Sequence, residues 1–323
     1  MLDVGIIGLG GWGRRLVESV QGKSGKVRFA GAASGSSGKA APFCETHGIK
    51  LYPDVTAMLA DPSIAAVVSA GPGALHAPHS LQALQAGKHV LAVKAMATTK
   101  AEADGLAAAA AASGKVLAMG FNRCFYPNVA ELRQRVKAGA LGALVHAEGN
   151  FCVDRYRKVQ AGSWKADPEQ APPGSLADHP LYLMIELLGP IAEVHAAATT
   201  QIATHIPLAD VTAVLLKFKG GQTGTLQANG VTPELTRLHV FGSAGWAEIR
   251  EQDYFLYKGL KGEPEHLEMT EIDAERAEME AFADAATGAA PFPYAVESAV
   301  HAIAVIEAMA KSAKSGKPET VAQ

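Results

Sequence analysis

Short runs of β-branched and small apolar residues alternate with helix-forming segments over residues 1–120. The expected strands are 4–7, 27–33, 65–70, 89–93 and 116–119. The expected helices between them are 12–21, 39–47, 76–86 and 100–112. Strands separated by helices of about ten residues need crossover connections, which are right-handed and join parallel strands. The pattern therefore predicts an α/β domain with a doubly wound parallel sheet that helices cover on both faces.

The pattern changes after residue 142, where strand-like runs follow one another without intervening helices. These runs cover 194–199, 211–218, 223–227, 238–241 and 247–249. Turn signals such as KGGQTG and GSAGW separate some of them, which is typical of antiparallel or mixed sheets. Two helices are expected to follow, over 273–287 and 294–315. We therefore predict a doubly wound domain over 1–121 and a second, α+β domain over 122–323, which meet along a cleft.

Composition and charge argue against several classes of partner. The chain has 323 residues and a formal net charge of -3 at pH 7, and both signs are scattered along it. A basic stripe that would bind nucleic acid or anionic lipid is not visible. No apolar segment approaches the roughly 20 residues of a membrane span, and the N-terminus shows no signal pattern, so we expect a cytoplasmic protein. Cys44, Cys124 and Cys152 lack the spacing of a disulfide framework or a zinc site, and no metal is expected.

A glycine-rich turn directly follows the first expected strand. Gly8, Gly10 and Gly13 form the pattern G-x-G-x-x-G, which also includes Gly11 and Trp12, and a helix begins at once. Glycine permits a tight turn and a close approach of the backbone to a pyrophosphate, while the helix N-terminus faces the negative charge. Because the turn follows the first strand of an alternating series, the pattern predicts a dinucleotide site.

The end of the second expected strand indicates which dinucleotide is preferred. NAD sites usually place Asp or Glu there to bind the ribose 2'-hydroxyl group. This chain instead reads AASGSSGKA and has no carboxylate before Glu45. Hydroxyl groups and an ammonium group favour a 2'-phosphate, so we predict a preference for NADP(H), with NAD(H) as the alternative. The residues concerned are Ser34, Ser36, Ser37 and Lys39. The structural alternative is a turn of small residues with a solvated lysine.

Four longer stretches occur in an informative order. They read GLGGWG, SAGPGALHAPHSLQALQAGKHVLAVKAMATT, GFNRCFYPNVAELRQRVKAGALG and SWKADPEQAPPGSLAD. In order and spacing they resemble the Gfo/Idh/MocA family, named for glucose-fructose oxidoreductase, inositol dehydrogenase and a rhizopine-catabolism protein. The resemblance implies a Rossmann domain followed by a domain with a large open sheet, which assembles into dimers or tetramers. It also implies nicotinamide-dependent oxidoreduction of a sugar, a polyol or another cyclic alcohol or carbonyl compound.

The resemblance draws attention to Lys94, which follows an expected strand at the edge where α/β sheets bind ligands. Family members usually read E-K-P where this chain has Val93, Lys94 and Ala95. A cis bond before Ala95 would be costly, so we expect the loop to take a different path here. Lys94 is predicted to contact cofactor and substrate and to favour the deprotonated form of a neighbouring acid. The structural alternative is a strand-end lysine that reaches solvent.

A second family motif usually reads D-x-G-x-H-x-x-D, where this chain has DHPLYLMI. Asp178 is retained, Tyr182 stands at the His position, and Ile185 replaces the last Asp. Glucose-fructose oxidoreductase and dimeric dihydrodiol dehydrogenases also have Tyr there, so the resemblance implies that Tyr182 transfers the proton. Asp178 would bind a substrate hydroxyl group or orient Tyr182, or it could cap the helix. His179 is the alternative base by pKa alone, and Tyr182 could equally be a packed tyrosine.

The resemblance implies further contacts and leaves other functions open. The expected cofactor contacts include Gly71, Pro72, Leu75, His76 and Asn122, and the expected substrate contacts include Arg123, Trp164, Lys165 and His179. Each of these residues could almost equally be an ordinary packing or surface residue. For His76 a structural role is the favoured interpretation. One alternative function is an NADP-binding sensor without turnover, which the changed residues beside Lys94 favour. The other is a glycoside hydrolase that uses the nicotinamide transiently.

Overall fold

The computed structural model describes residues 1–323, which form two compact units. The first unit contains residues 1–122 and 273–300, and the second contains residues 123–272 and 301–323. The first boundary lies one residue after the predicted one. Residues 273–300 differ from the prediction, which grouped them with the second domain. They belong to the first unit because the helix α8 (Ala274–Thr287) packs on α1 (Gly11–Val20) and on the core of that unit.

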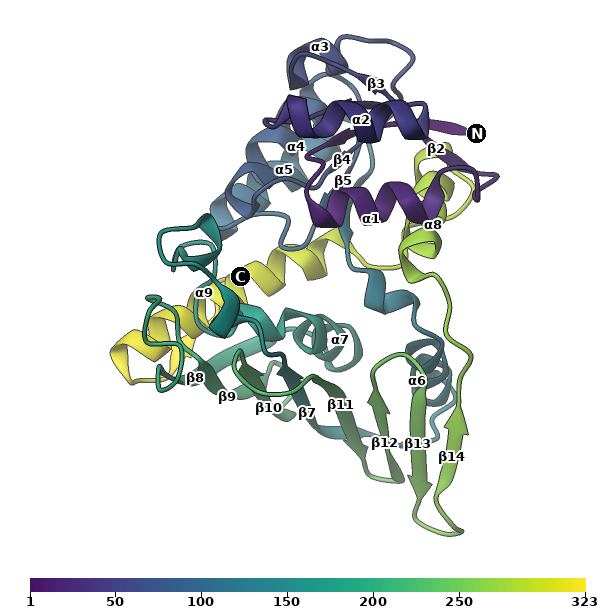
Figure 1. The fold of residues 1–323 in the computed structure, drawn as a ribbon. Coiled ribbons are helices and arrows are strands. Elements are labelled where there is room, and N and C mark those ends of the chain that lie inside the picture. The colour runs from purple at the N-terminus through teal and green to yellow at the C-terminus, as the bar shows by residue number, and fades with distance from the viewer. The chain divides into compact units, whose positions relative to one another are not determined.

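The first unit is built on a six-stranded parallel sheet with the strand order β3-β2-β1-β4-β5-β6. Its strands are β1 (Leu2–Ile7), β2 (Val27–Ala33), β3 (Lys50–Leu51), β4 (Ala66–Ser69), β5 (His89–Val93) and β6 (Leu117–Gly120). The connecting helices are α1, α2 (Ser37–His47), α3 (Val55–Leu59), α4 (His76–Gln85) and α5 (Lys100–Ser113) (Figure 1). The predicted doubly wound fold is confirmed. Only β3 and α3 were not predicted, because they are too short to give a periodic pattern.

The core of the first unit explains why α8 belongs to it. Ile6 of β1 and Leu16 of α1 are not exposed at all, and Met279 and Phe282 of α8 join the same apolar cluster. Strands that helices cover on both faces are buried along their whole length, as β4 is. The order of strands reverses between β1 and β4, and ligands bind outside the carboxyl ends of the strands at such a point.

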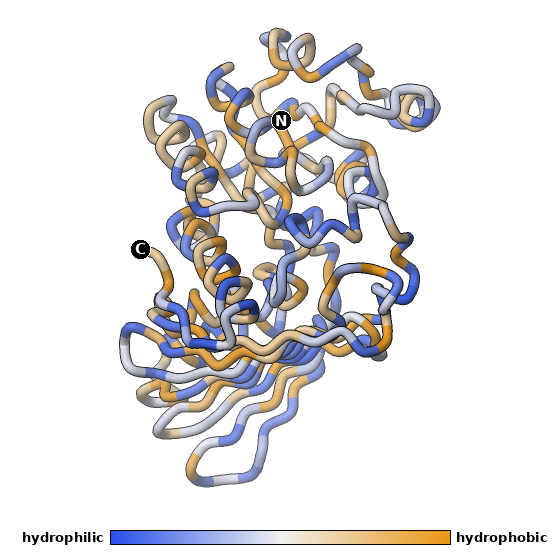
Figure 2. The backbone as a smooth tube through the Cα atoms, turned by 90° about the vertical axis from the view of Figure 1, so that its left-hand side faces the viewer, coloured by the Kyte–Doolittle hydropathy of each residue, from blue (hydrophilic) through white to orange (hydrophobic).

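The second unit is built on a nine-stranded sheet with the order β14-β13-β12-β11-β7-β10-β9-β8-β15. Its strands are β7 (Leu144–Cys152), β8 (Ile191–Thr199), β9 (Val211–Phe218), β10 (Thr223–Asn229), β11 (Leu235–Gly242), β12 (Gly245–Arg250), β13 (Tyr254–Gly259), β14 (Glu265–Glu268) and β15 (Glu319–Thr320). The strands β7 and β10 pair in parallel and the other neighbours are antiparallel, so the predicted mixed sheet is confirmed. Figure 2 shows these strands side by side.

Helices cover one face of the nine-stranded sheet. The helix α7 (Asp178–Leu188) packs on β7 and β11, and α6 (Pro127–Lys137) packs on β12 and β13. The helix α9 (Val296–Ser315) reaches β8, where the Ala196 N–H group donates to the Ser312 hydroxyl at 2.9 Å. A glycine lets α7 approach closely, because a Cβ at Gly149 would come within 2.9 Å of the Pro180 side chain. None of the helices is long and apolar enough to span a bilayer.

The opposite face of this sheet carries polar and charged side chains. Glu248 of β12 is 5 % exposed and accepts hydrogen bonds from Arg250 and, at 3.1 Å, from Arg237. Burial works to raise the pKa of Glu248, but hydrogen bonds from the two arginines outweigh it and hold the pKa below its ordinary value. On β9, by contrast, Leu215 is 60 % exposed. This face therefore combines a charge network with exposed apolar surface.

A buried carboxyl group in α8 makes the stability of the chain depend on pH. Glu278 is 1 % exposed, and its Oε1 atom has no hydrogen-bond partner. Burial, together with the neighbouring Glu275, raises its pKa well above the ordinary value of 4.5. The folded chain therefore holds this proton to a higher pH than the unfolded chain. It follows that the free energy of unfolding falls as the pH rises from 4.5 to the folded pKa, and stays lowered above it.

Replacing this carboxyl group with an amide should remove the fall. We expect Glu278→Gln to raise the melting temperature at neutral pH, because no ionisable group is then buried at this position. Thermal melts between about pH 4 and 9 measure the effect. Glu280→Gln, on the same helix but half-buried, is the control and should keep the wild-type profile. A fall of wild-type size in Glu278→Gln would contradict this assignment.

Candidate functional site

The glycine turn between β1 and α1 packs tightly against the protein on one side and has free space on the other. Gly8 has a φ of 97°, and a Cβ there would come within 2.7 Å of the backbone of Gly71. A Cβ at Gly13 would lie 2.1 Å from the carbonyl oxygen of Gly8. A Cβ at Gly10 or Gly11 would meet nothing within 4 Å. The turn thus leaves backbone exposed in the direction from which a pyrophosphate would approach.

The N-terminus of α1 is not capped by any side chain of the protein. Its N-cap residue is Gly10, and the first turn contains no acidic residue. The helix α8 is different, because Asp273 accepts the N–H group of Arg276 at 2.9 Å and Glu275 lies in the first turn. Uncapped N–H groups and the positive end of a helix dipole bind anions. The residues of this turn therefore fit a dinucleotide pyrophosphate.

The loop between β2 and α2 is polar and lies next to Arg14. Ser34 is half-buried, and Ser36, Ser37 and Lys39 are exposed. The Arg14 guanidinium donates from Nη2 to the Lys39 carbonyl at 2.8 Å and from Nε to the Leu9 carbonyl at 3.2 Å. It thereby joins the glycine turn to the first turn of α2. Arg14 was not predicted as part of the site, although it directly follows the last glycine of the motif.

His76 links two loops at the carboxyl edge of the parallel sheet. Its Nδ1 lies 2.8 Å from the carbonyl oxygen of Ala95, and its Nε2 lies 2.9 Å from that of Gly71. The ring is 3 % exposed, and burial holds its pKa below the ordinary value. On the same loop, Pro72 is half-buried and Leu75 is 42 % exposed. His76 therefore fixes the loop after β4 against the loop after β5.

Lys94 is the first residue after β5, as predicted, and it is half-buried. The peptide bond between Lys94 and Ala95 is cis. This is contrary to the expectation that alanine would give the loop a different path at this bond. The next carbonyl oxygen, that of Ala95, is the one that His76 holds. Burial is the main cause of the lowered pKa of His76, and the positive charge of the nearby Lys94 ammonium group lowers this pKa further.

Asn122 lies at the carboxyl end of β6 and is held by a residue that the sequence did not predict. The side chain is 8 % exposed, and its Nδ2 donates to Glu275 Oε1 at 3.3 Å. The same carboxylate oxygen lies 2.8 Å from Arg15 Nε. Glu275 is 153 positions away along the chain, so no local pattern could have revealed this contact.

In the second unit, α7 carries three of the predicted site residues. Asp178 is 3 % exposed, His179 8 %, and Tyr182 is completely buried. The helix begins at Asp178 with Ala177 as its N-cap residue, so the capping role that was left open for Asp178 is wrong. A carboxylate in the first turn still favours the helix through its dipole. Asp178 and Tyr182 are four residues apart and share one face of α7.

Phe151 of β7 joins His179 to Arg123. The centre of the His179 ring lies 5.6 Å from the centre of the Phe151 ring. The Arg123 guanidinium group lies 5.2 Å from the centre of the same Phe151 ring. Arg123 is therefore packed against an aromatic ring and does not extend into solvent.

Trp164 and Lys165 differ from this group, because both are exposed. The Lys165 ammonium group lies 5.7 Å from the centre of the Trp164 ring. The predicted substrate residues of the second unit thus fall into a buried or half-buried set and an exposed pair.

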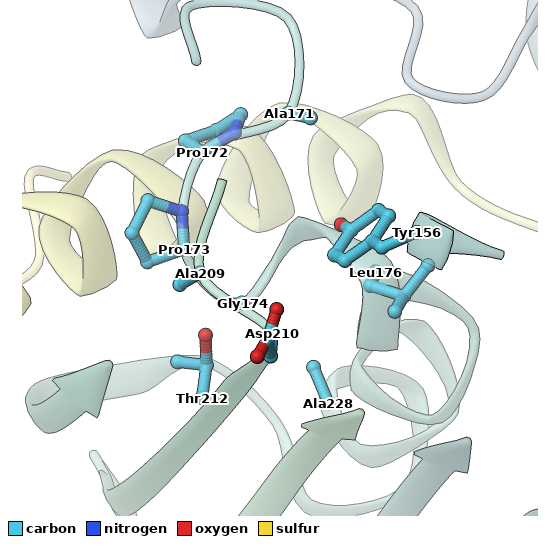
Figure 3. Close-up of a pocket in the computed structure, with 10 residues that line it drawn as sticks. All are labelled: Tyr156, Ala171, Pro172, Pro173, Gly174, Leu176, Ala209, Asp210, Thr212 and Ala228. Atoms are coloured by element: carbon cyan, nitrogen blue, oxygen red, sulfur yellow. The ribbon is translucent and has the colours of Figure 1, made fainter. Parts of the chain in front are cut away.

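A small pocket in the second unit surrounds Asp210 (Figure 3). Its lining residues are Tyr156, Ala171, Pro172, Pro173, Gly174, Leu176, Ala209, Asp210, Thr212 and Ala228. Its volume of about 10 Å³ admits about one water molecule and no sugar. Burial works to raise the pKa of Asp210, but hydrogen bonds from the N–H groups of Ile202, Gln201 and Ala203 outweigh it and lower the pKa. Asp210 therefore holds the loop between β8 and β9.

Comparison with known proteins gives the same division of the chain. A model described as "Oxidoreductase family, NAD-binding Rossmann fold" matches residues 2–121, and one described as "GFO/IDH/MocA C-terminal domain" matches residues 129–248. The oxidoreductase YfiI of Bacillus subtilis, itself uncharacterized, is 26% identical over 239 residues, which are 67% of this chain and 60% of that protein. The matches to two other curated relatives span 37% and 32% of their lengths.

Two further relatives match over nearly their whole length. Inositol 2-dehydrogenase 2 of Paenarthrobacter aurescens is 28% identical over 330 residues, which are 96% of each chain. The solved structure of a levoglucosan dehydrogenase in complex with NADH and L-sorbose has a TM-score of 0.89 and 18% identity, and the match covers 100% of this chain and 99% of that one. At this identity the structural match establishes the fold.

The contact between Gly13 and Gly8 gives a direct test of the turn. Gly13→Ala would force a Cβ against a backbone oxygen, so we expect a loss of about 2 kcal/mol in the free energy of unfolding. Gly11→Ala, two residues earlier, enters open space and should stay within about 0.5 kcal/mol of the wild type. Denaturant unfolding of the three proteins measures both effects. Equal stability of the two variants would show that the turn is not packed as described.

Proposed function

Because the chain belongs to the Gfo/Idh/MocA family of oxidoreductases, we propose that it is an NAD(P)-dependent dehydrogenase or reductase acting on CH–OH groups. The proposed substrate is a sugar, a polyol or another cyclic alcohol or carbonyl compound. The similarity to inositol 2-dehydrogenase 2 and to a levoglucosan dehydrogenase supports this class. The observation that carries the proposal is the uncapped, acid-free N-terminus of α1 beside a glycine turn that only glycine can form.

The residues of the first unit would hold the dinucleotide, whose nicotinamide ring accepts or donates the hydride when bound. We assign the pyrophosphate to the backbone of Gly8, Gly10, Gly11, Trp12 and Gly13. The remaining proposed contacts are Gly71, Pro72, Leu75, His76, Lys94 and Asn122. The contacts of His76 with two loop carbonyls, to one of which a neutral ring donates a hydrogen bond, support a rigid surface on this side. A rigid surface loses little entropy when a ligand binds.

We propose that NADP(H) is the preferred cofactor and that NAD(H) is the alternative. Glu18 is the only acidic residue between positions 4 and 44, so the loop after β2 offers no carboxylate to a ribose hydroxyl group. Lys39 and Arg14 supply two positive charges beside the hydroxyl groups of Ser34, Ser36 and Ser37. These groups favour a 2'-phosphate. The similarity to a levoglucosan dehydrogenase whose solved structure contains NADH supports NAD(H) as the alternative cofactor.

We assign proton transfer to Tyr182. An unperturbed phenol has a pKa near 10, and burial raises the pKa of a phenol further, so a phenol acts as a base only beside a positive charge. Lys94 is the proposed source of that charge. During oxidation Tyr182 would take the hydroxyl proton, and during reduction it would return the proton to the substrate oxygen. Asp178, one turn earlier on α7, would position the substrate, and His179 is the alternative base.

The other proposed substrate contacts are Arg123, Trp164, Lys165 and His179. Trp164 is 52 % exposed with Lys165 beside it, which offers a flat apolar face and a cation. A hydroxylated ring presents C–H groups to such a face and oxygen atoms to such a cation. Arg123 and His179 lie on the same aromatic ring and would bind polar groups of the substrate.

The proposed assembly is a homo-oligomer, a dimer or a tetramer, formed through the open face of the nine-stranded sheet. The exposed Leu215 and the ring contact of 3.9 Å between His239 and Phe241 support it, because apolar and aromatic residues are common in the centres of interfaces. The proposed location is the cytoplasm, where cysteines stay reduced, and Cys44, Cys124 and Cys152 are all free thiols here.

Binding measurements test the cofactor preference. Wild-type protein should bind NADPH more tightly than NADH. Lys39→Gln should weaken NADPH binding about tenfold and leave NADH binding unchanged, because a hydrogen bond to a charged phosphate is lost. Lys23→Gln removes an exposed lysine after α1 and is the control, with wild-type affinity for both. Tighter wild-type binding of NADH would overturn the preference.

Single substitutions test the proton transfer. Lys94→Met and Tyr182→Phe should each lower turnover by about two to four orders of magnitude and leave the dissociation constant of the cofactor nearly unchanged. Tyr156→Phe removes the hydroxyl group of another buried tyrosine of the same unit and should keep wild-type turnover.

Each other outcome points to a different assignment. Normal turnover of Tyr182→Phe would move the base role to His179. Cofactor binding without turnover of any alcohol or carbonyl compound in a broad panel would favour a sensor. Hydrolysis of glycosides without net formation of NADPH would indicate a hydrolase.

A further inference from the structure

Glu275 is a buried carboxylate that serves two partners in the first unit. Its side chain is 5 % exposed, and its Oε1 atom lies 2.8 Å from Arg15 Nε and 3.3 Å from Asn122 Nδ2. A buried carboxylate is costly unless it is paired and hydrogen-bonded. The ion pair with Arg15 is weak by itself, because the Arg15 side chain is 62 % exposed. The hydrogen bond from Asn122 is therefore part of what allows this charge to be buried.

Two ion pairs join α8 to α1 and to the segment that follows α1. Arg15, near the start of α1, pairs with Glu275, near the start of α8. Lys26, just beyond the end of α1, pairs with Asp284, near the end of α8. The two helices are in contact, and Figure 1 shows α8 next to α1. The hydrogen bond of Glu275 with Asn122, which follows β6, places the first turn of α8 at the carboxyl edge of the parallel sheet.

Asn122 belongs to the half of the sheet that receives the nicotinamide end of a dinucleotide. Doubly wound sheets bind one mononucleotide on each half, and the loop after β2 marks the adenosine half. Asn122 follows β6, at the outer edge of the other half. A carboxylate can only accept hydrogen bonds, so Glu275 draws the NH₂ group of Asn122 towards itself. The carbonyl oxygen of Asn122 must then point away from Glu275.

We propose that Glu275 is a positioning residue for the nicotinamide half of the cofactor. By holding the NH₂ group of Asn122, it presents the Asn122 carbonyl oxygen as an acceptor for the carboxamide NH₂ group of the nicotinamide. This inference rests on the proposed function, because it requires a nicotinamide dinucleotide. Glu278, one turn further along α8, has an Oε1 atom without a hydrogen-bond partner and serves as an internal comparison.

A truncated cofactor separates this role from a merely structural one. The probes are NADPH and 2'-phospho-ADP-ribose, which lacks the nicotinamide, and their dissociation constants are measured by calorimetry. Glu275→Leu should weaken NADPH binding about tenfold and change the binding of 2'-phospho-ADP-ribose less than about twofold. Glu275→Gln, which still offers an oxygen atom to Asn122, should recover most of the loss. Glu278→Gln should behave as the wild type with both probes.

Asn122→Leu removes the other partner of the same hydrogen bond and keeps the inference testable if Glu275→Leu does not fold. It should show the same selective loss of NADPH affinity. Parallel weakening of both probes, or no weakening of either, would overturn the positioning role. Wild-type protein that binds neither NADPH nor NADH would instead overturn the proposed function. If NADH proves the tighter ligand, NADH and ADP-ribose replace the two probes, and the same outcomes decide.

Discussion

The contact between Gly13 and the Gly8 carbonyl oxygen is the constraint on which the first unit depends. A methyl group at position 13 would lie 2.1 Å from that oxygen, so only glycine lets α1 begin directly above the end of β1. The position of α1 then fixes the surface on which α8 packs, and the pair of Arg15 with Glu275 ties the two helices together. Glu275 in turn holds Asn122 at the end of β6. One short contact thus sets the geometry of groups at both ends of the proposed cofactor site.

The two sheets differ in how many of their faces are covered by helices. The parallel sheet is covered on both faces, so its central strands are mostly apolar and β4 is buried along its whole length. The nine-stranded sheet receives α7 on one face and keeps charged residues on the other. Because the charged face partly buries Glu248, that carboxylate needs Arg237 and Arg250 beside it. Glu248 is thus a buried carboxylate with charged partners, whereas the N-terminus of α1 has no side chain that caps it.

Much of the fold and of the first half of the site could be predicted, because both follow from local patterns. The periodicity of β1 to β6 and the spacing of the glycines are short-range signals. The central strand β7 was missed for a physical reason. Its residues that face α7 include Ala147 and Gly149, which are small because the helix lies close, so the strand lacks the alternation of large apolar and polar residues. Glu275 could not be predicted either, because its role arises from a contact between segments that are distant in the sequence.

The departures from the family pattern are chemically related to one another. A histidine base tolerates neighbouring carboxylates, because negative charge favours its protonated form. A tyrosine base is the opposite case, because each nearby carboxylate raises the pKa of the phenol and disfavours the phenolate. At the last position of the second motif, one turn from Tyr182 on α7, this chain has Ile185, which is 4 % exposed and uncharged. Val93 likewise replaces a glutamate beside Lys94. For the proposed base Tyr182, the absence of a carboxylate at position 185 favours the phenolate, whereas the retained Asp178, one turn earlier on α7, opposes it.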